Sequence, residues 1–143
     1  MHGSPRYAVV AVLLATLLAG CGAAVTPPDS VTVDSTDAYA VEDTHVWTSG
    51  STTEYRSQVV VSGTLRSTDA TGNVSIPEIS VRFTLADGEA RTVETVYELD
   101  RRQTAFEDLE NATLAPDDRI PVRAVFDPAG GVTVRDATVR VGS

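Results

Sequence analysis

The chain has 143 residues, of which 20 are acidic and 11 are Lys or Arg, and its formal net charge is −9. This balance argues against a nucleic-acid partner, because phosphates require clustered Lys and Arg, and no lysine occurs in the chain. It equally argues against direct adsorption of the protein to anionic lipid.

Residues 1–20 have the three parts of an export signal. A basic start ends at Arg6, an apolar run extends from Tyr7 to Leu18, and small residues follow. As a helix, residues 7–20 would rise about 21 Å, which is too short for a hydrocarbon core about 30 Å thick. A cleaved signal peptide is therefore favoured over a membrane-spanning helix.

The signal ends in Leu18-Ala19-Gly20-Cys21, which resembles the lipobox of prokaryotic lipoproteins. In that family the cysteine is lipidated and the chain is cut just before it. The resemblance implies that the mature protein begins at Cys21 and is held at the extracytoplasmic face of the cell membrane. Two acyl chains on Cys21 would anchor it stably. A plain secretory signal and an uncleaved anchor are the alternatives.

Without residues 1–20 the chain keeps all 20 acids and ten of the 11 arginines, so its net charge is 10 − 20 = −10. Acid surplus without lysine resembles proteins of salt-loving archaea, in which high salt screens the self-repulsion. An ordinary acidic surface in an organism with a GC-rich genome is the alternative. Cys21 is the only cysteine, so no intramolecular disulfide can form.

Residues 21–38 are expected to form the lipidated cysteine and a flexible acidic tether. Pro27-Pro28 and small polar residues are typical of a linker. Val31 and Val33 alternate with polar residues, so an edge strand is the other interpretation of this segment.

Residues 39–143 are expected to form one domain, in which apolar residues recur with a period of two. Such alternation predicts half-buried strands. Asp87-Gly88 predicts a hairpin after one of them, and residues 128–131 predict another between the last two. Capping-box spacing at Asp100 and Thr104 predicts a short helical turn or an irregular crossover. The expected strand residues are Val59, Val61 and Leu65; Ile79, Val81, Phe83 and Leu85; Val93, Thr95, Tyr97 and Leu99; Val122, Ala124 and Phe126; and Val132, Val134, Ala137, Val139 and Val141.

These segments predict an all-β fold, an immunoglobulin-like β-sandwich of about seven strands. The expected core consists of Val61, Leu65, Val81, Phe83, Leu85, Tyr97, Phe126 and Val139.

The stretch from Val59 to about Val141 resembles the FxLyD domain, an immunoglobulin-like sandwich common on prokaryotic surface lipoproteins. Phe83-Thr84-Leu85-Ala86-Asp87 matches the naming motif, with Ala86 in place of Tyr. Leu114-Ala115-Pro116-Asp117 is similar to the family's Leu-x-Pro-Gly turn, with Asp117 in place of Gly. The resemblance implies the sandwich fold and a place at the cell surface, and it implies no catalytic residue, ligand or cofactor.

Residues suited to catalysis or metal binding are scarce. His45 is the only histidine after the signal, and no nucleophile elbow accompanies it. Zinc and copper sites would need more His and Cys ligands than the chain has. Two acidic groups could attract calcium but lack the spacing of a calcium loop: Glu107, Asp108 and Glu110, and Asp117 with Asp118. We therefore expect no catalytic residue, metal or cofactor.

Both asparagines of the chain lie in N-glycosylation sequons, Asn73-Val74-Ser75 and Asn111-Ala112-Thr113. Both sequons fall in predicted loops, and an exported protein would expose them to modification. Asn73 and Asn111 are therefore candidate glycan acceptors.

An anchor, a charged linker and a domain without a recognisable active site predict a non-catalytic binding or interaction module at the cell surface. Its expected partners are the membrane, through lipid on Cys21, and another surface or membrane protein. Tyr39, Trp47 and Tyr55 are candidate contacts, or else packing residues of the first strand. A small enzyme or substrate-capture protein with an acidic loop site around His45 is the first alternative. A passive structural component of the envelope is the second.

Overall fold

The structure, a computed structural model, describes residues 25–51, 56–109, 111–128 and 132–142. The signal peptide, the lipobox and Cys21 lie outside these residues. The described chain forms strands and one short 3-10 helix: β1 (Val31–Asp34), β2 (Tyr39–Ser51), β3 (Arg56–Ser67), β4 (Val74–Ser75), β5 (Ile79–Leu85), β6 (Ala90–Glu94), β7 (Val96–Leu99), β8 (Arg102–Ala105), η1 (Phe106–Leu109), β9 (Thr113–Leu114), β10 (Ile120–Phe126) and β11 (Val134–Val141).

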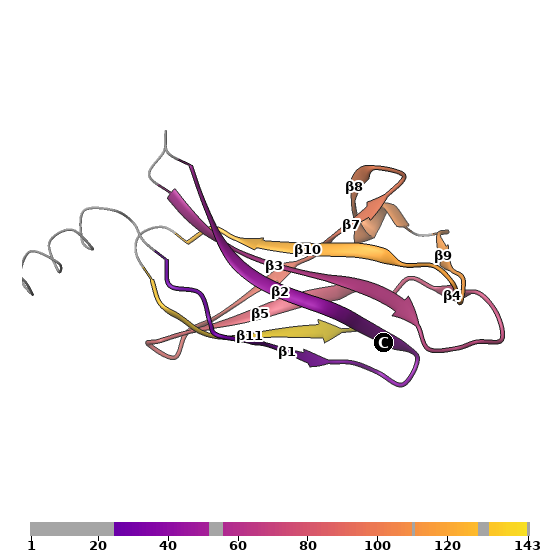
Figure 1. Ribbon diagram of the computed structural model, residues 1–143, viewed down its shortest axis with the longest axis horizontal. Coiled ribbons are helices and arrows are strands. Elements are labelled where there is room, and N and C mark those ends of the chain that lie inside the picture. The colour runs from indigo at the N-terminus through magenta and orange to yellow at the C-terminus, as the bar shows by residue number, and fades with distance from the viewer. Residues whose placement is uncertain (1–24, 52–55, 110, 129–131, 143) are drawn as a thin grey trace, which may run out of the picture.

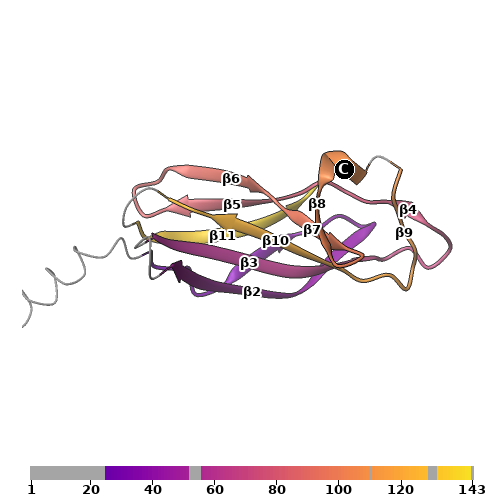
Figure 2. The same ribbon diagram turned by 90° about the horizontal axis from the view of Figure 1, so that it is seen from above.

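The strands form a β-sandwich, as the alternating pattern predicts. One sheet has the order β1-β11-β5-β6 and the other β2-β3-β10-β7-β8, while β4 and β9 pair in a separate two-stranded ribbon. Figure 1 and Figure 2 show the long strands running along the long axis of the molecule, with the β4–β9 ribbon at one end. The expected all-β sandwich is confirmed.

The core lies between the two sheets, where the rings of Phe83 on β5 and Phe126 on β10 stack with centroids 4.9 Å apart. The strand β5 alternates strictly between buried and more exposed residues, because successive side chains point to opposite faces. All eight predicted core residues are buried, namely Val61, Leu65, Val81, Phe83, Leu85, Tyr97, Phe126 and Val139.

The strand order corresponds to that of an immunoglobulin domain, whose sheets contain strands A-B-E-D and C-F-G. Strands β2-β3-β10-β7 take the places of A-B-E-D, and β5 and β11 take those of C and F. The place of the last strand, G, is taken by β1 from the beginning of the chain. Strand β1 pairs with β11 in parallel, from Val31 opposite Ala137 to Asp34 opposite Arg140.

The segment expected as a tether is therefore largely part of the domain. Val25 is buried, with 7% of its surface exposed. The Thr26 amide donates to the Val132 carbonyl at 3.0 Å, and the Val134 amide donates to the Thr26 carbonyl at 2.9 Å. The edge-strand interpretation of Val31 and Val33 agrees with β1. Alternating valines can complete a sheet in spite of the polar residues around them, so the sandwich includes described residues that precede Tyr39.

One expected strand, Val93 to Leu99, is divided between the two sheets. Its first part lies in β6, which pairs with β5, and its second part is β7, which pairs with β10. The change of sheet takes place at the buried Thr95, whose amide and hydroxyl both donate to the Ile79 carbonyl, at 3.0 and 2.9 Å. Alternation alone does not reveal such a change, because the period of two continues through it.

The connections agree with the predictions only in part. Asp87-Gly88 does form the turn between β5 and β6, and Gly88 has a φ of 94°. The expected hairpin at residues 128–131 is wrong, because β10 and β11 belong to different sheets. A helical turn is present at residues 106–109, but residues 102–105 form β8, which pairs with β7.

The hydroxyl group of Tyr97 connects the two sheets in the core. Tyr97 lies on β7, has no exposed surface, and donates a hydrogen bond to the Pro77 carbonyl at 2.6 Å. It also accepts one from the amide of Ile79, the first residue of β5, at 2.9 Å. Since a buried polar group without a partner is costly, this hydroxyl satisfies both backbone groups where β5 begins.

Replacing Tyr97 by Phe should therefore lower the free energy of unfolding by about 1–3 kcal/mol, because two buried backbone groups lose their partner. Tyr39→Phe is the matched control, since the Tyr39 hydroxyl donates to the Ser75 carbonyl in an exposed position. We expect a smaller loss for the control in urea titrations. Equal losses would contradict the role assigned to the Tyr97 hydroxyl.

The wild type and the Tyr97→Phe variant should also differ in their stability at alkaline pH. Burial raises the pKa of Tyr97 above its ordinary value of 10.0, although hydrogen bonding with Thr95 and Ile79 opposes the shift. Above pH 10 the unfolded chain therefore releases the Tyr97 proton before the folded protein does, and the free energy of unfolding falls as pH rises. Unfolding measured from pH 8 upward should show this decline in the wild type and a shallower one in Tyr97→Phe.

Candidate functional site

The outward face of the five-stranded sheet is shaped by a β-bulge in β2. Glu42 pairs with Thr64 and His45 pairs with Ser62, so two residues of β2 stand opposite Gly63 alone. Asp43, within the bulge, has a φ of 51°. A bulge adds one residue to a strand and so reverses the faces that the following side chains occupy. After the bulge, His45 and every second residue that follows it in β2 point away from the core.

An apolar row crosses this outward face over three neighbouring strands. Trp47 on β2 and Val125 on β10 both pair with Val60 on β3. Trp47 is 41% exposed and Val125 38% exposed, whereas Val60 between them is only 4% exposed. Trp47 and Val125 are the large hydrophobic side chains that stand exposed among the described residues. Together with Val60 they form one apolar row across three neighbouring strands.

A shallow groove of about 320 Å³ begins at Trp47 and continues across the sheet beside this apolar row. Its lining residues come from all five strands of the sheet, β2, β3, β10, β7 and β8. The lining residues are Asp43, His45, Trp47, Ser62, Gly63, Thr64, Val96, Glu98, Gln103, Pro121, Val122 and Arg123.

The groove contains charges of both signs. Asp43, Glu98 and Arg123 are exposed and line it from three different strands. The ion pairs found among the described residues lie elsewhere, between Arg66 and Glu42 at 2.5 Å and between Arg91 and Glu89 at 2.9 Å. The groove therefore presents a cation and two carboxylates to whatever binds there.

His45 lies in this groove together with Asp43 and Glu98, which is the combination that the enzyme alternative requires. All three side chains are exposed. No hydrogen bond between His45 and a carboxylate is present among the described residues. Because all three side chains are exposed in the groove, they are placed to contact a ligand that enters it.

Of the other two predicted contact residues, Tyr39 does not line the groove. Tyr39 is partly buried and its hydroxyl donates to the Ser75 carbonyl at 2.6 Å, which ties β2 to the β4–β9 ribbon. Tyr55 lies outside the described residues. The lipobox also lies outside them, so the structure does not test the prediction made for Leu18, Ala19, Gly20 and Cys21.

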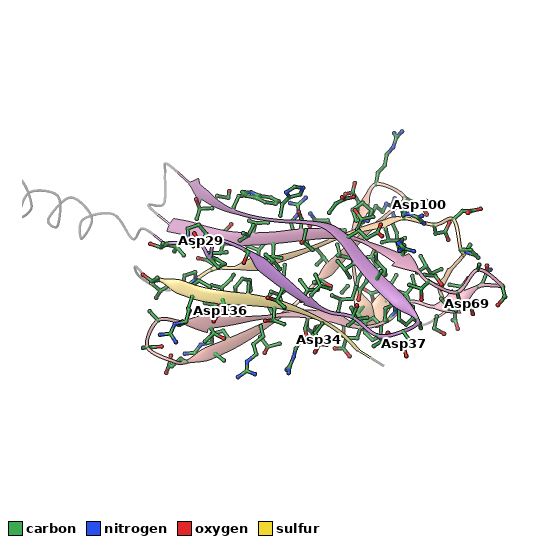
Figure 3. The ribbon with its side chains drawn as sticks, turned by 60° about the horizontal axis from the view of Figure 1, so that its bottom comes forward. Asp29, Asp34, Asp37, Asp69, Asp100 and Asp136 are labelled. Atoms are coloured by element: carbon green, nitrogen blue, oxygen red, sulfur yellow. The ribbon has the colours of Figure 1, made fainter. Side chains whose placement is uncertain are left out.

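The acidic residues are dispersed over the surface. Glu107 and Asp108 are exposed on η1, and Glu110 lies outside the described residues. Asp118 accepts a hydrogen bond from the Ala115 amide at 2.8 Å and so closes the turn before β10. Figure 3 shows six further aspartates spread from one end of the molecule to the other. No group of three or more His, Cys, Asp and Glu side chains in the described part of the chain is arranged to hold a metal ion.

Sequence reasoning identified Trp47 and His45 but missed Val60, Val125 and Arg123. The last three look like ordinary members of alternating strands. Their common face depends on which strands are neighbours and on the bulge in β2, and neither is visible in a hydrophobic pattern. The positive φ at Asp43 leaves only a weak signal, since Asp tolerates that conformation better than most residues.

Comparisons with known proteins add no relative: no protein-family model, no curated protein and no solved structure matches this chain. Within the described residues, no helix has the length and apolar character needed to cross a membrane.

Gly63 allows the bulge to form, so Gly63→Ala should disturb both stability and the groove. An added Cβ would lie 2.7 Å from Val41 Cγ1 and 3.3 Å from the Glu42 carbonyl oxygen. We expect a loss of about 1–3 kcal/mol in the free energy of unfolding. Gly72→Ala is the control, because a Cβ there meets nothing within 4 Å. Wild-type stability in Gly63→Ala would show that the bulge tolerates a side chain.

Proposed function

We propose that this protein is a lipid-anchored, non-catalytic binding module on the extracytoplasmic face of the cell membrane, and that its partner is a membrane protein. The observation that carries the proposal is the apolar row beside the groove, in which Trp47 and Val125 are exposed on either side of the buried Val60. The resemblances to the lipobox and to the FxLyD domain belong to the same proposal. So does the halophilic origin suggested by the acidic composition.

The spacing between Cys21 and the domain supports a position close to the membrane. Val25 is already buried in the sandwich. Consecutive Cα atoms are 3.80 Å apart, so the four steps from Cys21 to Val25 reach at most about 15 Å. A lipid on Cys21 would therefore hold this end of the sandwich next to the bilayer.

The apolar row lies towards that same end. Figure 1 shows the last residues of β2 at the end of the molecule where the described chain begins, and Figure 3 places Asp29 there. Trp47 is four residues before Ser51, the last residue of β2, or about 13 Å at 3.3 Å per residue. A protein that is itself held in the membrane is therefore best placed to reach Trp47.

The side chains that line the groove indicate which contacts such a partner would make. Tryptophan and arginine are among the residues that most often dominate binding energy at protein interfaces, and both Trp47 and Arg123 line the groove, together with polar residues. A matching surface would place an apolar side chain against Trp47 and Val125. It would also provide an acidic group for Arg123 and a basic group near Asp43 or Glu98.

The anchor is tested by the intact mass of the protein purified from its native host. We expect a chain that lacks residues 1–20 and carries a lipid adduct on Cys21. The Cys21→Ser variant should be recovered from the medium rather than from the membrane fraction. An unmodified Cys21 thiol in membrane-bound protein would refute lipid anchoring and leave the groove proposal to be judged separately.

The docking surface is tested by in-cell crosslinking at native salt, followed by identification of the recovered membrane proteins. Trp47→Ala should reduce recovery of the partner about 30-fold, because truncation of a central tryptophan costs about 2 kcal/mol or more of binding free energy. Thr92→Ala, exposed on β6 of the opposite sheet, is the control and should leave recovery unchanged. Undiminished recovery of the partner with Trp47→Ala would contradict docking at the groove. Recovery of no partner would favour small-ligand capture or passive envelope structure.

A further inference from the structure

The fold brings together the two sequons, which are separated by more than 30 residues in the sequence. Strand β4 pairs with β9 so that Val74 stands opposite Leu114 and Ser75 opposite Thr113. Ser75 and Thr113 are the hydroxyl residues that complete the two sequons. The β4–β9 ribbon is therefore built almost entirely from the two acceptor motifs.

Both motifs present their reactive residues on the exposed side of this ribbon. Asn73, Ser75, Asn111 and Thr113 are all exposed, whereas Leu114 has no exposed surface. Val74 and Ala112, the middle residues of the sequons, are half-buried and pack against the core. Since side chains in a strand alternate between faces, the pairing of Ser75 with Thr113 places both hydroxyl residues on one outer face.

The ribbon is held in place without using these reactive groups. The Tyr39 hydroxyl donates to the backbone carbonyl of Ser75 at 2.6 Å and leaves the Ser75 hydroxyl out of the contact. In the preceding loop, Asp69 Oδ1 accepts from the Thr71 amide at 2.9 Å and from its hydroxyl at 2.5 Å. These hydrogen bonds from Thr71 also lower the pKa of the Asp69 carboxyl.

The ribbon also lies at the end of the molecule opposite the start of the described chain. Figure 1 shows β4 and β9 at one end, and Figure 3 places Asp69 at that end and Asp29 at the other. In the orientation set by a lipid on Cys21, the ribbon faces away from the membrane, and the groove remains on the side of the sandwich.

We propose that the β4–β9 ribbon is a double acceptor site for N-linked glycan, modified at both Asn73 and Asn111. The donor is an oligosaccharide carried on a lipid phosphate, and a separate membrane transferase performs the step. A bond forms between the amide nitrogen Nδ2 of each asparagine and the anomeric carbon of the sugar. The bond from that carbon to the carrier phosphate breaks, the phosphate leaves as an anion, and the amide loses one proton. The glycans cover the membrane-distal tip and leave the outward sheet face open to a partner.

The test is the mass of the peptides that contain residues 73 and 111 in protein purified from the native host. We expect a glycan increment on each, lost separately in Asn73→Gln and in Asn111→Gln. Ser75→Ala should also lose the increment at Asn73, although it keeps the asparagine. Ser75→Thr is the matched control and should keep the increment, because either hydroxyl residue completes a sequon. Unmodified peptides at both positions would overturn the proposal, and so would modification of only one.

This test is independent of the proposed anchor and partner. The Cys21→Ser variant, if exported, should still carry both glycans, because the ribbon does not depend on the lipid. The double variant Asn73→Gln, Asn111→Gln should still crosslink to the partner through the groove. Loss of the partner in a folded double variant, checked by circular dichroism, would contradict the assignment of the ribbon and the groove to separate surfaces.

Discussion

Strand β1 pairs in parallel with β11 and occupies the place that the last strand takes in an immunoglobulin domain. Without it, β11 would present a free sheet edge and the valines of β11 would lose part of their cover. The hydrogen bonds between Thr26 and residues 132–134 extend the contact towards the chain start. The first described residues, 25–34, are therefore a structural part of the sandwich.

The other features follow from that arrangement. Because three residues separate Cys21 from the buried Val25, a lipid on Cys21 would keep this end of the sandwich within about 15 Å of the lipidated residue. One end would face the membrane and the β4–β9 ribbon would face away from it. The groove beside Trp47 lies on the flank between them. The proposed anchor, partner surface and glycan site thus occupy three separate parts of the molecule.

Much of the fold was predictable from the alternation of apolar residues. Strands β5, β10 and β11 and the whole predicted core follow it, because each of these strands is buried mainly on one face. Strand β3 follows it as well, except that Val60 on its outward face is also buried. The pattern could not reveal the change of sheet at Thr95 or the separation of β10 from β11. Both depend on which strands become neighbours, and neighbours are chosen by packing between sheets rather than by the period of a single segment.

The candidate site was less predictable from the sequence than the fold was. By itself, the sequence determined the acidic charge, the export signal pattern, the two sequons and the alternating strands, because these are properties of composition and local order. Only the tertiary structure decided that Trp47 is outside the core. Val41 and Trp47 would share one face of an unbroken strand, yet Val41 is buried and Trp47 is exposed. The bulge opposite Gly63 separates them, since it inserts one extra residue where a Cβ on the partner strand would not fit.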